Sequence, residues 1–228
     1  MPTLVELVEL CDAVYGDASS KTIQLKQSSV VWNRTQRWSD GAFFAALYTK
    51  AGGDSVLAYR GTDDAVDVLM DDRDVAFGQV PPSASDAVNV AGGLAKGKVI
   101  LTGHSLGGAL SIITAGRFGL PAVTFNAPGV MNSCVRANAF GAVRNNGLSG
   151  LVDLVGRCFN GSRMENIRID GDAVSSPLTA LLSASLQSGG AQSLGAPQCG
   201  LDLLCRHGIA TCIAAVRSRP AGFQEVNL

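Results

Sequence analysis

One short segment of the chain carries the residues best suited to nucleophilic chemistry. Residues 103–107 read Gly-His-Ser-Leu-Gly, so Ser105 lies in a G-x-S-x-G pattern. An apolar run at residues 99–102 precedes the pattern, and a helix-compatible run at residues 109–117 follows it. A strand-to-helix turn this tight needs almost side-chain-free residues beside the serine and directs its hydroxyl away from the sheet. The segment therefore predicts a serine nucleophile at the N-terminus of a helix.

A serine hydroxyl needs a base that removes its proton as it attacks, and histidine suits this task best at neutral pH. The chain contains two histidines, His104 and His207. His104 is adjacent to the serine in sequence, where neighbouring side chains point apart. The base is therefore predicted to be His207.

The base in turn needs a carboxylate that fixes its tautomer and stabilises its protonated form. The chain order serine, acid, histidine places this carboxylate between the nucleophile and the base, just beyond the end of a strand. Asp170 and Asp172 both satisfy this condition, and the turn position of Asp172 favours it. Asp153 and Asp202 are weaker alternatives. The aspartate that is not the acid is expected to cap a turn.

The tetrahedral intermediate of acyl transfer needs an oxyanion hole, normally made by two backbone N–H groups. One group is expected from Leu106, the residue after the nucleophile. The other is expected from a loop that follows an earlier strand, and the segment 59–62 (Tyr-Arg-Gly-Thr) ends such a strand. We therefore expect the backbone N–H of Thr62, together with its hydroxyl, to face the oxyanion.

The remaining sequence predicts the elements that position these residues. Apolar periodicity predicts an opening helix between Leu4 and Val14 and another from Ser83 to the Gly92-Gly93 region. Apolar runs predict strands at residues 42–49, 55–60, 99–102, 122–125 and 167–170. Strands that alternate with helices form a mostly parallel sheet with helices on both faces, so the fold class is α/β. In such sheets the site lies at the carboxyl ends of the strands.

Two stretches, residues 131–165 and 175–206, are rich in Gly, Ser and Asn and are expected to be irregular. They are the candidates for a cap or for pocket-lining segments within a single domain that spans residues 1–228. Leucines at helical spacing between Leu178 and Leu186 predict either core packing or a pocket wall. The acidic run at residues 63–74 predicts a solvated helix, with a metal cluster as the less simple alternative.

Three segments resemble the class 3 lipases, which are the fungal-type triacylglycerol lipases and their bacterial relatives. They are Arg60-Gly61-Thr62, Thr-Gly-His-Ser-Leu-Gly-Gly-Ala at residues 102–109, and Thr-Phe-Asn-Ala-Pro-Gly-Val at residues 124–130. Asp71 lies between the first two, as in the family. The resemblance implies a single domain with the α/β-hydrolase fold.

The resemblance also implies a role for each site residue. The nucleophile of the family falls on Ser105, its acid on Asp172 and its base on His207. Its oxyanion pair falls on Thr62 and Leu106. A site of this kind requires neither a metal nor a cofactor.

The resulting expectation is a serine hydrolase of carboxylic esters, either an esterase or a lipase. It would cleave short- to medium-chain acyl esters or acylglycerols through an acyl-enzyme, with transient contact to a lipid interface. Two alternatives remain open. One is a phospholipase, such as a toxin delivered to the membrane of another cell, and the other is a non-catalytic binding protein that keeps the hydrolase fold.

Composition narrows the partners and the compartment. The formal net charge is −1, so nothing indicates a nucleic-acid partner. No apolar run approaches the roughly 20 residues of a transmembrane helix. Residues 1–6 carry neither a basic region nor an apolar region of a signal peptide, which predicts a cytoplasmic protein. Export by another route and trimming to a mature form are the alternatives.

The cysteine pattern bears on whether the chain has a zinc site, free thiols or disulfides. The chain has six cysteines without C-x-x-C spacing, which argues against a zinc site. Cytoplasmic thiols are the simpler expectation, although the even number also permits disulfides. Cys199, Cys205 and Cys212 lie near one another in sequence and are the first place to expect a bridge.

Overall fold

The computed structural model describes most of the chain, namely residues 1–16, 21–26, 30–62, 79–94, 98–160, 163–172, 174–175, 190–199 and 202–219. The acidic run at residues 63–74 and the leucine-rich stretch between Leu178 and Leu186 lie outside the described residues. The predictions made for these two segments therefore remain predictions.

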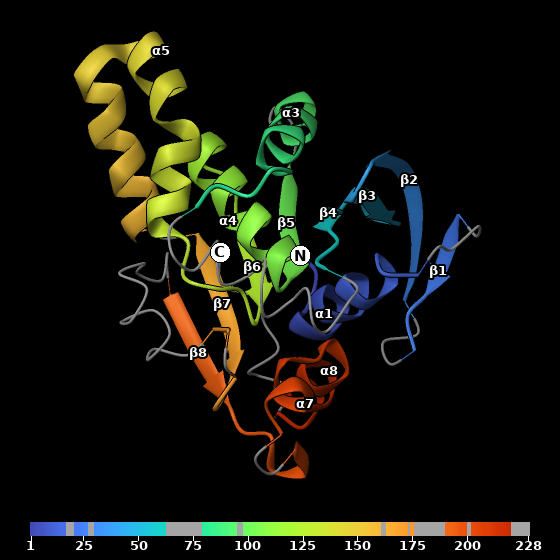
Figure 1. Cartoon of the computed structure of the whole chain (residues 1–228). Coiled ribbons are helices and arrows are strands. Elements are labelled where there is room, and N and C mark those ends of the chain that lie inside the picture. Colours follow the sequence, from blue (N-terminus) through green and yellow to red (C-terminus); the bar gives the residue numbers. More distant parts are fainter. Residues whose placement is uncertain are drawn as a thin grey trace.

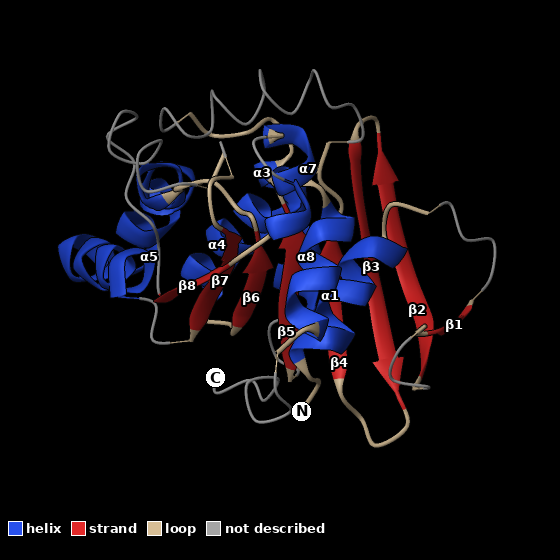
Figure 2. Cartoon of the chain, turned by 90° about the horizontal axis from the view of Figure 1, so that it is seen from below, coloured by secondary structure: helices blue, strands red, loops and turns tan. Residues whose placement is uncertain are grey.

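A single eight-stranded sheet forms the centre of the molecule, with its strands in sequence order across the sheet (Figures 1 and 2). The first four strands pair antiparallel, and every pair from β4 to β8 is parallel. The strands are β1 (Thr22–Gln24), β2 (Val31–Asp40), β3 (Phe43–Lys50), β4 (Ser55–Tyr59), β5 (Val99–His104), β6 (Ala122–Phe125), β7 (Met164–Ile169) and β8 (Gly190–Leu194). The predicted α/β class with a mostly parallel sheet is confirmed.

Helices cover both faces of this sheet, and Figure 1 shows the two layers on opposite sides of the strands. One layer contains α1 (Leu4–Ala13), α7 (Leu203–His207) and α8 (Ile209–Arg217), with the 3-10 turn η1 (Pro197–Cys199) before α7. The other contains α3 (Ala84–Leu94), α4 (Leu106–Phe118) and α5 (Met131–Asn160).

The central strand β4 shows why the sequence folds this way. Successive residues of a strand point to opposite faces. Val56 and Ala58 accordingly pack in the cluster that contains α1 and α8, whereas Leu57 and Tyr59 pack in the cluster that contains α3 and α4. A strand that is covered on both faces reads as a continuous apolar run, which is how this one could be recognised from sequence.

The expectation of irregular structure is wrong for the described part of residues 175–206, which contains β8, η1 and most of α7. It is also wrong for residues 131–165. Most of this stretch is α5, whose two helical segments meet at Asn146 and Gly147 and lie side by side (Figure 1). The glycines that suggested a loop allow close packing instead. A Cβ atom on Gly150 would overlap the carbonyl of Ala142 in the other segment.

The expectation of free thiols is also wrong for four of the six cysteines. Cys134 and Cys158 form a disulfide between the two segments of α5, and Cys199 and Cys205 form another between η1 and α7. The second bridge lies where proximity in sequence had suggested one. The first could not be found from spacing, because it depends on the hairpin shape of α5. The remaining thiols, Cys11 and Cys212, are buried.

A buried ion pair fastens α1 to the antiparallel part of the sheet. Glu6 is 3% exposed, and its carboxylate accepts hydrogen bonds from Lys50 Nζ at 3.1 Å and from Trp32 Nε1 at 3.3 Å. The same side chain accepts from the backbone N–H of Thr3, whose hydroxyl in turn accepts from the N–H of Glu6. This reciprocal capping box starts α1 and fixes its position over β2 and β3.

No helix within the described ranges is long and apolar enough to cross a membrane.

The ion pair makes a stability prediction. Lys50→Met leaves the buried Glu6 carboxylate without its cation, and we expect a loss of about 3 kcal/mol in the free energy of unfolding. Urea unfolding followed by circular dichroism measures this loss. The double variant Glu6→Gln/Lys50→Met should recover at least half of it, because no unpaired charge is then buried. A Lys50→Met protein as stable as the parent would contradict the expectation.

Candidate active site

The turn between β5 and α4 holds Ser105 in a conformation that L-residues rarely adopt. Its backbone has φ 55° and ψ −127°, between the last residue of β5 and the first of α4. A Cβ atom on Gly103 would overlap the backbone of Gly107, and one on Gly107 would overlap the carbonyl of Tyr59. The two glycines predicted from the G-x-S-x-G pattern are thus required by the close approach of neighbouring backbone.

Three residues that are far apart in sequence meet at this turn. Nε2 of His207 lies 2.7 Å from Oγ of Ser105, and Nδ1 of His207 lies 2.8 Å from Oδ1 of Asp172. All three side chains are buried. A neutral His207 that donates its Nδ1–H to the carboxylate leaves Nε2 free to accept from the serine hydroxyl. The geometry is that of a nucleophile, a base and an orienting acid.

Asp172 is held by more than the histidine. Its Oδ2 accepts a hydrogen bond from the backbone N–H of Ser175 at 2.8 Å and another from the hydroxyl of the same residue. Burial on its own would raise the pKa of Asp172, but the hydrogen bonds from His207 and Ser175 outweigh it and keep the pKa below its ordinary value. The carboxylate therefore remains charged at neutral pH.

The other aspartates considered as the acid lie elsewhere. Asp170 is exposed, and its carboxylate accepts from the hydroxyl of Ser193. Asp153 is exposed on α5, and Asp202 accepts from the backbone N–H of Cys205 at 3.0 Å at the start of α7. Asp172 is thus the aspartate that the structure brings to the histidine. The expectation that Asp170 would then cap a turn is wrong, because its carboxylate bonds Ser193 on the neighbouring strand β8.

The backbone carbonyl of His207 is fixed by two side chains that sequence reasoning did not assign to the site. His104 Nε2 lies 2.6 Å from this oxygen, and Asn126 Nδ2 donates to it at 3.1 Å. Asn126 also donates to the carbonyl of Arg206 at 3.0 Å. The signal available from the sequence was its position directly after β6, which neighbours β5, because the carboxyl ends of parallel strands lie at the same edge of the sheet.

His104 contributes as a neutral donor. A carbonyl only accepts, so Nε2 carries the hydrogen, and Nδ1 accepts from the Tyr15 hydroxyl at 3.1 Å. Burial, reinforced by the neighbouring His207, lowers the pKa of His104 to about 3. The prediction that His104 is not the base is consistent with this environment. Nothing in the local sequence pointed to Tyr15.

The predicted oxyanion residues lie beside the nucleophile. A Cβ atom on Gly61 would lie 3.4 Å from Cβ of Ser105 and 2.6 Å from the carbonyl oxygen of His104, so the segment 60–62 passes next to the turn. The Thr62 hydroxyl is buried and has no hydrogen-bond partner among the described residues. Leu106 is the first residue of α4, where backbone N–H groups have no partner within the helix.

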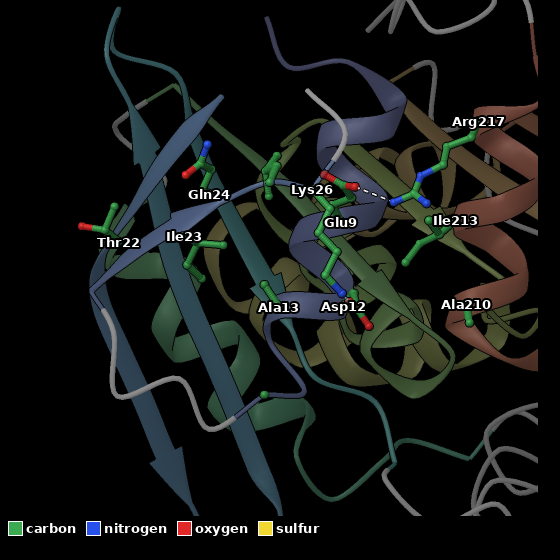
Figure 3. Close-up of a pocket in the computed structure, with 12 residues that line it drawn as sticks. Glu9, Asp12, Ala13, Thr22, Ile23, Gln24, Lys26, Ala210, Ile213 and Arg217 are labelled. Carbon is green, nitrogen blue, oxygen red and sulfur yellow. Dashed lines mark hydrogen bonds and ion pairs between the residues drawn. The ribbon is translucent and has the colours of Figure 1, made fainter. Parts of the chain in front are cut away.

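A separate hollow of about 650 Å³ opens between α1, β1 and α8 (Figure 3). Its wall carries the ion pair between Glu9 and Arg217, whose Oε1 and Nη2 atoms are 2.7 Å apart. Apolar side chains from the two sides, Ile23 and Ile213, also line it. No triad residue is among its lining residues, so this hollow is distinct from the site at Ser105.

Comparison with known proteins identifies the family. A family model described as a Tle-like phospholipase domain matches residues 8–221. No curated protein matches the sequence.

Several solved structures are similar in shape at low sequence identity. The native Rhizomucor miehei lipase propeptide complex has 16% identity and a TM-score of 0.49, and the match covers 82% of this chain and 64% of that one. A variant of MDLA from Penicillium cyclopium has 13% identity and a TM-score of 0.49, with 83% and 77% covered. Carboxyl esterase 2 from Tuber melanosporum has 12% identity and a TM-score of 0.32, with 99% of each chain covered. This chain thus spans just under two thirds of the Rhizomucor lipase chain.

The fold and the family agree with the resemblance drawn from the sequence. The sheet order, the helices on both faces and the strand–serine–helix turn are those of the α/β-hydrolase fold. The family model extends over nearly the whole chain. The chain therefore belongs to the family described by the Tle-like phospholipase domain.

Proposed function

We propose that the chain hydrolyses acyl esters of lipids through an acyl-enzyme formed on Ser105. The observation that carries this proposal is the continuous hydrogen-bonded line from Ser105 through His207 to Asp172, with distances of 2.7 Å and 2.8 Å. The buried and charged Asp172 keeps the imidazole in the tautomer whose free nitrogen faces the serine.

In the first half-reaction, His207 removes the hydroxyl proton as Ser105 attacks the ester carbonyl. The backbone N–H groups of Thr62 and Leu106, with the unpartnered Thr62 hydroxyl, donate to the oxyanion. A buried donor without a partner among the described residues is the arrangement expected of a group that bonds only in the transition state. The protonated His207 then gives its proton to the leaving alcohol, and the acyl group remains on Ser105.

In the second half-reaction, His207 takes a proton from water, which attacks the acyl carbonyl. The tetrahedral intermediate uses the same oxyanion donors, and its collapse returns the proton to Ser105 and releases the fatty acid. His207 thus mediates every proton transfer in the cycle, while the backbone N–H groups only donate hydrogen bonds to the oxyanion. The complete triad argues against the alternative of a non-catalytic binding protein.

The proposed substrate is the acyl ester of a glycerophospholipid. The description of the family favours a phospholipid over the short esters and acylglycerols that the sequence alone suggested. Contact with a lipid surface would then be part of each turnover, and no transmembrane helix would be needed for it.

The two disulfides also change the proposed compartment. Disulfides persist in oxidising compartments and are rare in the reducing cytoplasm. The bridges Cys134–Cys158 and Cys199–Cys205 therefore favour activity in an oxidising, extracytoplasmic compartment over the cytoplasmic location expected from residues 1–6.

The mechanism predicts which variants lose activity. Ser105→Ala should abolish hydrolysis of a p-nitrophenyl ester and labelling by a fluorophosphonate probe. Asp172→Asn should lower kcat by about 10⁴-fold, because the histidine loses its orienting charge. Asp170→Asn is the matched control and should stay within about twofold of the parent, since the exposed Asp170 carboxylate bonds Ser193 and the substitution leaves its backbone contacts in place. Steady-state kinetics decide the matter, and full activity in Ser105→Ala would overturn the proposal.

The substrate assignment is tested by direct comparison of lipids. Purified protein is incubated with phosphatidylglycerol or phosphatidylcholine vesicles, trioctanoylglycerol emulsion and p-nitrophenyl butyrate, and released fatty acid is quantified by mass spectrometry. We expect phospholipids to be cleaved at least 10-fold faster than the acylglycerol. Faster cleavage of the acylglycerol would favour a triacylglycerol lipase while leaving the triad chemistry intact.

The buried neutral His104 predicts a pH effect on stability. Its pKa is about 3 when folded and 6.5 when unfolded, so between these values only the unfolded chain binds the proton. Unfolding is then favoured as the pH falls, by up to about 1.4 kcal/mol per pH unit. Asp172, whose folded pKa is also depressed, adds an effect of the same sign at lower pH.

The variant His104→Gln isolates this contribution, because its amide still reaches the carbonyl of His207 but does not titrate. Urea unfolding from pH 7 to pH 4 should show a shallower loss of stability in the variant than in the parent. Identical slopes would mean that His104 is protonated in the folded state.

A further inference from the structure

The disulfide between Cys199 and Cys205 lies next to the catalytic base in the chain. Cys205 is two residues before His207, and both belong to α7. The partner, Cys199, ends η1, and the Cα atoms of the two cysteines are 5.6 Å apart. The bridge therefore ties the short helix that carries His207 directly to the segment that precedes it.

A helix of five residues cannot hold its own position. Isolated helices of fewer than about 12 residues are marginal in water, since few backbone bonds repay their nucleation. Asp202 caps α7 through the N–H of Cys205, and Thr211 of α8 donates to the carbonyl of Cys205 at 2.6 Å. The Thr211 hydroxyl also lies 3.6 Å from the sulfur of Cys199 and 3.8 Å from that of Cys205. The bridge lies at the centre of these contacts.

The other end of the bridge is anchored to the strands that position the acid. The backbone N–H of Cys199 donates to Ala196, which is buried and follows β8 by two residues. The last residue of β8, Leu194, accepts from the N–H of Asp170 at 2.8 Å. Asp170 starts the turn that presents Asp172, so the bridge connects the support of the acid to the support of the base.

We propose that the Cys199–Cys205 disulfide positions His207 for catalysis, so that the enzyme is competent when this bridge is oxidised and impaired when it is reduced. This inference rests on the proposed acyl-enzyme mechanism. The bridge touches neither substrate nor reacting atoms and acts through the placement of the imidazole. A misplacement of about 1 Å in such a group costs on the order of 10²-fold in rate.

Reduction of the bridge has a simple chemical balance. One dithiothreitol molecule supplies two thiols, the Cys199–Cys205 S–S bond breaks to give two cysteine thiols, and dithiothreitol becomes its cyclic disulfide. Cys205 is partly exposed and offers a point of attack. The two remaining thiols, Cys11 and Cys212, are buried, which limits exchange with them.

The second disulfide provides a matched control. Cys134 and Cys158 join the two segments of α5, which carries no triad residue, and both are fully buried. This bridge closes a longer loop, with a sequence separation of 24 against 6. The longer loop restricts the unfolded chain more, so its removal should cost more stability. Removal of the Cys134–Cys158 bridge is thus expected to lower stability more, whereas removal of the Cys199–Cys205 bridge is expected to lower activity more.

The experiment compares the parent, Cys199→Ala/Cys205→Ala and Cys134→Ala/Cys158→Ala, each assayed well below its melting temperature. We expect kcat on p-nitrophenyl butyrate to fall 10- to 100-fold in the first variant, with KM within about twofold of the parent. The second variant should keep its kcat but melt at a lower temperature than the first. Dithiothreitol should lower the kcat of the parent to that of the first variant, and reoxidation should restore it.

Three controls separate the outcomes. Fluorophosphonate labelling of Ser105 in the oxidised parent must succeed first, and its failure would count against the proposed function and not against the bridge. Mass spectrometry after alkylation establishes which cysteines were reduced. Unchanged kcat with both Cys199 and Cys205 alkylated would overturn the inference. So would a loss of activity that follows the loss of far-ultraviolet circular dichroism, since the bridge would then only maintain the fold.

Discussion

The structure depends on one close backbone contact, the approach of Gly107 at the start of α4 to the carbonyl of Tyr59 at the end of β4. Because no side chain fits there, α4 begins directly against the sheet, and Ser105 takes the positive φ of the turn. The contact sets the distance from the nucleophile to the segment 60–62, which carries the expected oxyanion donors. A single steric constraint thus links the strand order of the sheet to the geometry of the reaction.

Polar groups buried beside His207 hold this residue through its backbone carbonyl. His104, at the end of β5, and Asn126, directly after β6, both bond the backbone carbonyl of His207, while Asp172 orients its imidazole ring. Such a network stabilises one arrangement only when all its members are satisfied. The neutral state of His104 meets this condition, because a charged ring would leave Nδ1 unable to accept from Tyr15.

The sequence allowed the central strands to be predicted, and also the meeting of Ser105, Asp172 and His207, because each depends on a local pattern. The apolar run of β4, the pentapeptide around Ser105 and the scarcity of histidines needed no knowledge of distant contacts. The helical hairpin α5 was missed because its glycines serve helix–helix packing, which local propensity interprets as loop. Tyr15 and the Cys134–Cys158 bridge were missed because only the tertiary arrangement brings their partners together.

The separation of the triad along the chain has a consequence for biosynthesis. Ser105 and His207 are 102 residues apart, and the base follows the last strand of the sheet. A growing chain therefore completes the nucleophile turn long before it acquires a base, and the most sequence-distant contacts are generally the slowest to form. Under the proposed mechanism, the topology of the sheet alone therefore keeps partly synthesised and partly folded chains inactive.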